Sequence, residues 1–109
     1  MLNVLLAKAG GRLRCEAEGH ALFDQKGRDI VCAASSILLR TAARTLKKWP
    51  GIRLEGDAPQ RGVFKFEATA DSDSAKAGMR FAADFLREGF ESLAKDFPQN
   101  ILFECNLEE

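Results

Sequence analysis

The chain contains a single histidine, His20, and Cys32 is the next cysteine along the sequence. A thiol and an imidazole together can carry out nucleophilic acyl chemistry, because the imidazole takes the thiol proton and the thiolate attacks a carbonyl carbon. The pairing in sequence is a weak signal by itself. Free cysteines commonly pack as small apolar side chains, and a lone histidine at a strand end is more often a structural or solvent-facing residue.

The surroundings of Cys32 give a physical reason for choosing this thiol. Asp29 is a typical N-cap residue, and the sequence after it predicts a helix, so Cys32 falls in the first helical turn. Unpaired amides and the helix dipole favour a thiolate there, and with an imidazolium nearby they lower cysteine pKa values from about 8.5 to roughly 3.5 to 7.5. The same amides could donate hydrogen bonds to the oxyanion of a tetrahedral intermediate.

The other two cysteines, Cys15 and Cys105, stand at apolar positions of strand patterns, which favours core packing for both. Three cysteines without a Cys-x-x-Cys pair argue against a disulfide framework and against a structural zinc site. We therefore expect no metal and no cofactor. A redox-sensing thiol is a weaker hypothesis, because no resolving cysteine lies nearby in sequence.

These residues need elements to position them, and apolar periodicity predicts the elements in the order ββαββαβ. In chain order we expect strands at 2–7 and 12–18, a helix from 29 to about 48, strands at 52–56 and 63–69, a helix capped by 71–74 and ending before 98, and a strand at 101–107. Each helix has one apolar stripe, so both should lie on one face of a mixed sheet. The expected fold is an α/β protein, specifically an α+β two-layer sandwich in a single domain spanning 1–109.

The apolar stripe of each predicted helix indicates which residues face the core. For the first helix these are Ile30, Ala33, Ala34, Ile37, Leu38, Ala42 and Leu46. For the second they are Ala75, Met79, Ala82, Leu86, Phe90 and Leu93, with Phe81, Phe85 and Phe97 widening the stripe.

Composition restricts the partners. Sixteen basic residues balance sixteen acidic ones, so bulk charge gives no attraction to nucleic acid or to anionic lipid. The N-terminal apolar run is too short for a signal peptide, and no stretch approaches the roughly 18 apolar residues of a membrane span. We expect a cytoplasmic protein without direct contact to nucleic acid or membrane.

The run Gly-His-Ala at 19–21, a loop ending in Gly27, and Asp-Ile-Val-Cys-Ala-Ala at 29–34 followed by Ser36 resemble the ribosomal-processing cysteine protease family, Prp. Members are small homodimeric bacterial enzymes that remove the N-terminal extension of ribosomal protein number twenty-seven of the large subunit. The resemblance implies that His20 is the catalytic histidine and Cys32 the nucleophile. It further implies a ribosomal-protein N-terminal peptide as substrate and a homodimer.

The same resemblance marks Asp29 and Ser36 as supporting motif residues. Asp29 could cap the helix or orient the imidazole, and Ser36, one turn beyond Cys32, could bond the thiol or serve only in packing. Gly19 and Gly27 flank the intervening loop and would suit hinges. The chain departs from the family at Ser35, where a valine is common.

A second interpretation is a non-catalytic ribosome-assembly or peptide-binding module that keeps the fold without turnover. Retention of both His20 and Cys32 argues against it.

Overall fold

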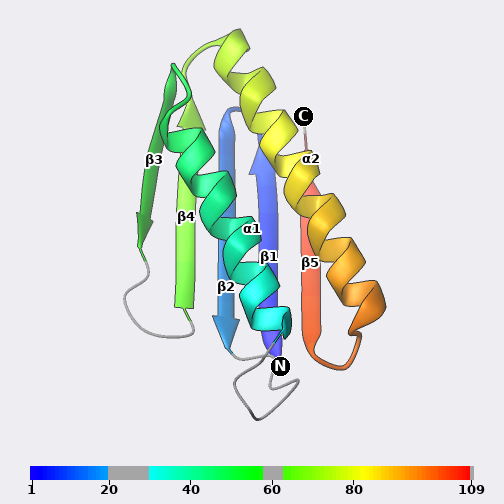
Figure 1. Ribbon diagram of the computed structural model, residues 1–109. Coiled ribbons are helices and arrows are strands. Elements are labelled where there is room, and N and C mark those ends of the chain that lie inside the picture. The colour runs from blue at the N-terminus through cyan, green and yellow to red at the C-terminus, as the bar shows by residue number, and fades with distance from the viewer. Residues whose placement is uncertain (20–29, 58–62, 109) are drawn as a thin grey trace.

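The computed structural model describes residues 1–19, 30–57 and 63–108 (Figure 1). The elements in chain order are β1 (Leu2–Ala9), β2 (Arg12–Gly19), α1 (Ile30–Lys47), β3 (Ile52–Asp57), β4 (Val63–Ala70), α2 (Asp73–Asp96) and β5 (Ile101–Leu107). The predicted order ββαββαβ is confirmed, and each predicted element agrees with the observed one to within two residues at each described end.

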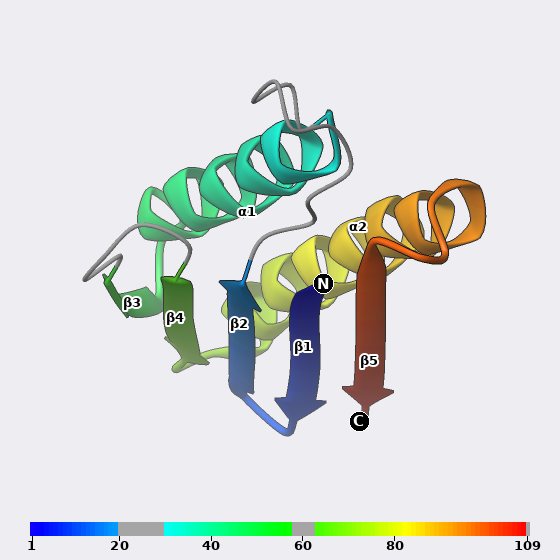
Figure 2. The same ribbon diagram turned by 90° about the horizontal axis from the view of Figure 1, so that it is seen from below.

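The strands form one five-stranded sheet in the order β3-β4-β2-β1-β5. β1 pairs with β5 in parallel, whereas the β1–β2, β2–β4 and β3–β4 pairs are antiparallel, so the sheet is mixed. Both helices cover the same face (Figure 2). The expected two-layer α+β architecture is confirmed.

The hairpin of β1 and β2 forms the centre of the core. Gly10 turns the chain with φ 59°, a backbone conformation that glycine adopts without a steric penalty. Leu6 lies opposite Cys15 in the register, and both side chains are fully buried under the helices. Burial of Cys15 confirms the expectation from strand alternation. The same prediction of core packing was wrong for Cys105, because β5 is an edge strand and leaves the Cys105 side chain exposed.

Helix α2 begins at the cap that the sequence indicates: the Ser72 hydroxyl accepts a hydrogen bond of 3.1 Å from the Ala75 amide. Its buried face includes Met79, Leu86 and Phe90, as predicted. The prediction that Phe81 and Phe85 widen this buried face was wrong, since these side chains are 70% and 46% exposed. Both positions lie about a quarter-turn or more away from the stripe that the sheet covers.

Helix α1 is rotated from its predicted orientation. Ile30 and Ile37, expected in the core, are 56% and 61% exposed. Ala42 and Leu46 are buried as predicted, but the other buried residues of the helix are Val31, Ser35 and Leu39, which the prediction did not include. Apolar residues occur on two neighbouring faces of this helix, which differ by a rotation of about one residue. Apolar periodicity alone could not show which of the two faces packs on the sheet.

Two glycines of α2 set its contact with α1. A Cβ atom at Gly78 would collide with the Trp49 indole, and one at Gly89 would lie 3.0 Å from both Leu38 Cδ atoms. The two helices run antiparallel and side by side (Figure 1). Their contact, called the seam below, includes Leu38 against Gly89 and, just beyond the end of α1, Trp49 against Gly78.

We predict that Gly78→Ala destabilises the fold by about 1 to 3 kcal/mol, because the rigid indole cannot move aside without overpacking. Gly89→Ala is the matched control. There the flexible Leu38 side chain can shift, and alanine favours a helix over glycine by about 1 kcal/mol. Urea denaturation of both variants measures the difference, and equal midpoints would contradict this account of the seam.

Candidate active site

Cys32 is the third residue of α1 and lies in its first turn, as predicted. The first turn contains no acidic residue, so no carboxylate in it opposes the positive end of the helix dipole. The side chain is partly buried and packs against the edge of the core. Cys32 therefore combines partial accessibility with a position that favours the thiolate.

The direction of Cys32 follows from the helix contacts. Leu38, which touches Gly89 of α2, comes six residues later, or about 240° around the helix. Cys32 accordingly points about 120° away from the direction of Leu38 and so away from the contact with α2. Figure 1 shows β4 and β3 on the side of α1 away from α2.

On that side of the sheet two inward-facing side chains, Leu54 and Phe64, are only partly buried. The Phe64 ring meets Phe66 edge to face, with centroids 6.1 Å apart. Phe64 pairs with Ala17, a buried residue, so its side chain is on the inward face. Leu54 and Phe64 remain partly uncovered because α1 is tilted across the sheet. No local pattern in the sequence predicts this tilt.

Gly19 ends β2 at the same end of the molecule where α1 begins (Figure 1). Its φ is 102°, and a Cβ atom would lie 2.6 Å from the Met1 carbonyl oxygen, so only glycine fits. The hinge predicted here stays a prediction, and the described geometry is a strand end whose backbone lies close to Met1. The predictions for His20, Gly27 and Asp29 fall outside the described residues.

The two serines after Cys32 have different surroundings. Ser36 is exposed, one turn beyond Cys32. Ser35 is 4% exposed, and its Oγ has no hydrogen-bond partner among the residues that the structure describes. A buried hydroxyl without a partner lowers stability, so this position would suit an apolar residue better.

The environments of the other two thiols, Cys15 and Cys105, do not favour the thiolate. Burial, the largest cause, and the neighbouring Glu16 raise the pKa of Cys15 to about 12. The pKa of Cys105 is also raised, chiefly by desolvation, while Arg87 opposes the shift and Glu91 and Asp84 add to it. Both groups are therefore neutral thiols near neutral pH.

The buried thiol Cys15 makes stability depend on alkaline pH. Its pKa is about 12 in the folded chain against 9.0 for the ordinary group. Its contribution is complete below about pH 9 and is lost as the pH rises through that window, by about 1.4 kcal/mol per unit at most. We predict that Cys15→Ala flattens the alkaline decline of the urea midpoint, while Cys105→Ser, which removes a more exposed thiol, flattens it less. The same slope in all three proteins would contradict the assignment.

The chain was compared with known proteins. The profile of the family described as cysteine protease Prp matches residues 1–102. The chain belongs to this family and is a cysteine protease by that membership. No curated protein matches.

Among solved structures, a ribosomal processing protease Prp from S. aureus with a covalently linked product peptide superposes with a TM-score of 0.72, at 19% identity, over 97% of this chain and 100% of that one. The same enzyme with a substrate peptide gives a TM-score of 0.73 at 18% identity over 97% and 100% of the two chains. A Streptococcus mutans protein gives 0.69 at 22% identity over 99% and 96%. At these identities the likeness establishes the fold.

Two further observations concern the described part of the chain. Neither α1 nor α2 is long and apolar enough to cross a membrane. Within residues 1–19, 30–57 and 63–108, no three His, Cys, Asp or Glu side chains are grouped so that they could hold a metal ion.

Proposed function

We propose that this protein is an endopeptidase that removes the N-terminal extension of a ribosomal protein, number twenty-seven of the large subunit. Cys32 is the nucleophile and His20 the general acid and base. The observation that carries the proposal is the position of Cys32, a partly buried thiol in the first turn of α1, in a chain of the Prp family.

The chemistry follows from these two groups. The imidazole of His20 takes the Cys32 proton, and the sulfur attacks the scissile carbonyl to form a tetrahedral intermediate. First-turn amides of α1 stabilise its oxyanion. Collapse of the intermediate breaks the C–N bond, and the imidazolium protonates the leaving amine. His20 then activates the water that hydrolyses the thioester.

The supporting residues keep more limited roles. Asp29 precedes α1 directly and would cap it, which fixes the aim of the Cys32 sulfur. Ser36 has its exposed hydroxyl one turn from Cys32, within the region that a substrate backbone would cross. Gly19 and Gly27 bound the segment that carries His20 and would serve as its hinges.

An extended peptide is the substrate form that this surface favours. The S. aureus enzyme has been solved with a substrate peptide and with a covalently linked product peptide. On the side of α1 away from α2, partly buried Leu54 and Phe64 offer apolar surface for substrate side chains. We further propose that the single domain works in the cytoplasm as a homodimer, as its family likeness implies.

The alternative of a non-catalytic peptide-binding module is decided by one pair of variants. Cys32→Ala should lower cleavage of an extended ribosomal-protein peptide by a factor on the order of 10⁴ or more, because nucleophilic catalysis is lost. The exposed Cys105→Ala variant is the control and should cleave normally. Mass spectrometry follows the products, and circular dichroism checks the fold.

Alkylation by iodoacetamide at about pH 6 tests activation of the same thiol. Cys32 should react much faster than Cys105, although Cys105 is exposed, because the pKa of Cys105 is raised. Full cleavage by Cys32→Ala would end the proposal. Slow alkylation of Cys32 together with no cleavage by the wild-type chain would favour the non-catalytic module.

A further inference from the structure

Charge is unevenly distributed along this electrically neutral chain. Between residues 30 and 54 there are five basic residues and no acidic residue. They are Arg40, Arg44, Lys47, Lys48 and Arg53. The bulk balance of charge, which predicted no attraction to nucleic acid, does not describe this segment, because an anion responds to the local field.

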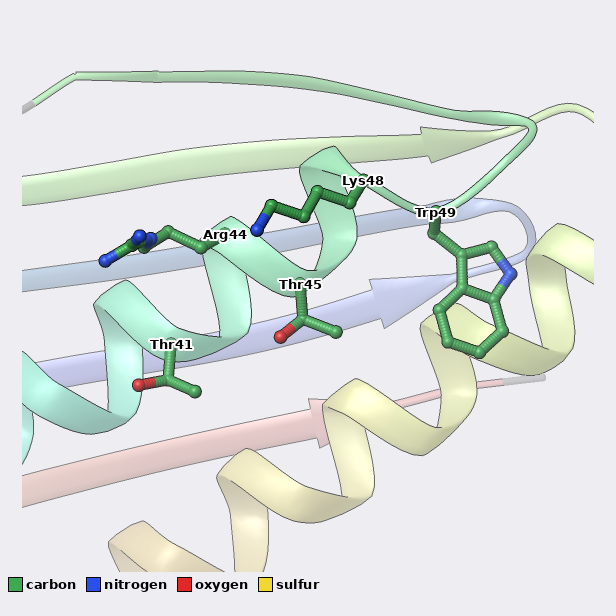
Figure 3. A pocket seen from close by; sticks show the side chains of 5 residues that line it. All are labelled: Thr41, Arg44, Thr45, Lys48 and Trp49. Atoms are coloured by element: carbon green, nitrogen blue, oxygen red, sulfur yellow. The ribbon is translucent and has the colours of Figure 1, made fainter.

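An open depression of about 450 Å³ lies over the last two turns of α1 (Figure 3). Its lining consists of Thr41, Arg44, Thr45, Lys48 and Trp49. In Figure 3 the Lys48 side chain extends along α1 towards Arg44, and the Trp49 indole points towards α2. The volume lies within the roughly 300 to 1,000 Å³ of small-molecule sites, so the depression can hold a nucleotide unit.

The two cations of this depression, Arg44 and Lys48, are not paired with an acidic side chain in the part of the chain that the structure describes. Like charges four residues apart on a helix repel each other and lower its stability by a few tenths of a kcal/mol. On α2, between Gly78 and Arg87, the one acidic residue is Asp84, which lies 3.6 Å from Arg87. A bound anion would relieve the repulsion between the two cations.

Aromatic rings line the same seam between the helices. Trp49 is held by its contact with Gly78, yet 37% of it is exposed. Phe81 and Phe85 follow Gly78 by three and seven residues and precede Gly89, so they lie along the edge of α2 that faces α1. Both are exposed. Three accessible rings thus accompany the cations and the threonine hydroxyls.

We propose that this seam binds single-stranded nucleic acid. Arg44 and Lys48 contact successive phosphates, the hydroxyls of Thr41 and Thr45 donate hydrogen bonds to phosphate oxygens, and bases stack on Trp49 and Phe81. Cationic side chains beside aromatic platforms are the combination that single-stranded nucleic acids bind. An acidic protein segment would use the charges and leave the exposed rings unmatched. The site is separate from Cys32 and does not depend on the peptidase proposal.

The chain carries its own probe of this site. Trp49 is the single tryptophan and there is no tyrosine, so intrinsic emission reports on the depression alone. Titration with a short oligouridylate should quench the emission, and added salt should weaken the binding. Oligodeoxythymidylate in a parallel titration distinguishes RNA from DNA. A fluorescent oligoglutamate of equal charge, followed by anisotropy, tests the acidic protein segment.

Variants separate the two contributions. Arg44→Gln/Lys48→Gln should reduce the slope of log affinity against log salt by about 1.4, because two phosphate contacts are lost at about 0.7 each. Lys65→Gln/Lys95→Gln removes the same charge from two exposed positions elsewhere and should keep the slope. Phe81→Ala should weaken binding on the order of tenfold without changing the slope, since only stacking is lost.

Three results would overturn the proposal. They are the absence of quenching by either oligonucleotide, equal loss of binding in the two glutamine double variants, and oligoglutamate binding as tight as oligouridylate. Peptide cleavage by Arg44→Gln/Lys48→Gln should equal that of the wild type. Failure of this proposal therefore leaves the peptidase unaffected.

Discussion

The contact between α1 and α2 is the constraint on which the rest of the molecule depends. Gly78 admits the Trp49 indole and Gly89 admits Leu38, so the two helices approach more closely than side chains at those positions would permit. This contact sets the rotation of α1 about its axis. Because side-chain directions along a helix are linked, the rotation that directs Leu38 towards α2 directs Cys32 about 120° away from it.

The same constraint separates two surfaces. Cys32 points away from the contact with α2, and Leu54 and Phe64, also only partly buried, belong to β3 and β4. On the side of α2 lies the seam with Trp49 and the exposed rings of α2. The local environment of each cysteine then determines the reactivity of its thiol. Cys15 is silenced by burial, and the pKa of Cys105 is raised, whereas Cys32 stands at the positive end of a helix dipole.

Most of the fold could be predicted because its signals are local. Strand alternation, helical periodicity and the cap at 71–74 act within a few residues, and they predict the element order and bounds. Features that depend on tertiary contacts could not be predicted. The orientation of α1 left Ile37 exposed and Ser35 buried, and the edge position of β5 exposed Cys105.

The candidate site shows the same division. Helix-capping logic was enough to put Cys32 in a first turn, and the motif from 19 to 36 pointed to the family. The apolar surface at Leu54 and Phe64 was not predicted, because it depends on which part of the sheet α1 leaves uncovered. One feature of the sequence pointed to the seam, namely the spacing of Arg44 and Lys48 by about one helical turn. It was not used, because the prediction about nucleic acid rested on the net charge of the whole chain.

If Cys32 carries the acyl group during cleavage, the intermediate can be trapped on its sulfur. The protein is mixed with an extended ribosomal-protein peptide, quenched in acid at short times, and mapped by mass spectrometry. We expect an N-terminal product fragment bound as a thioester to Cys32, which disappears as free product forms. Cleavage with no adduct, or an adduct on Cys15 or Cys105, would contradict this role.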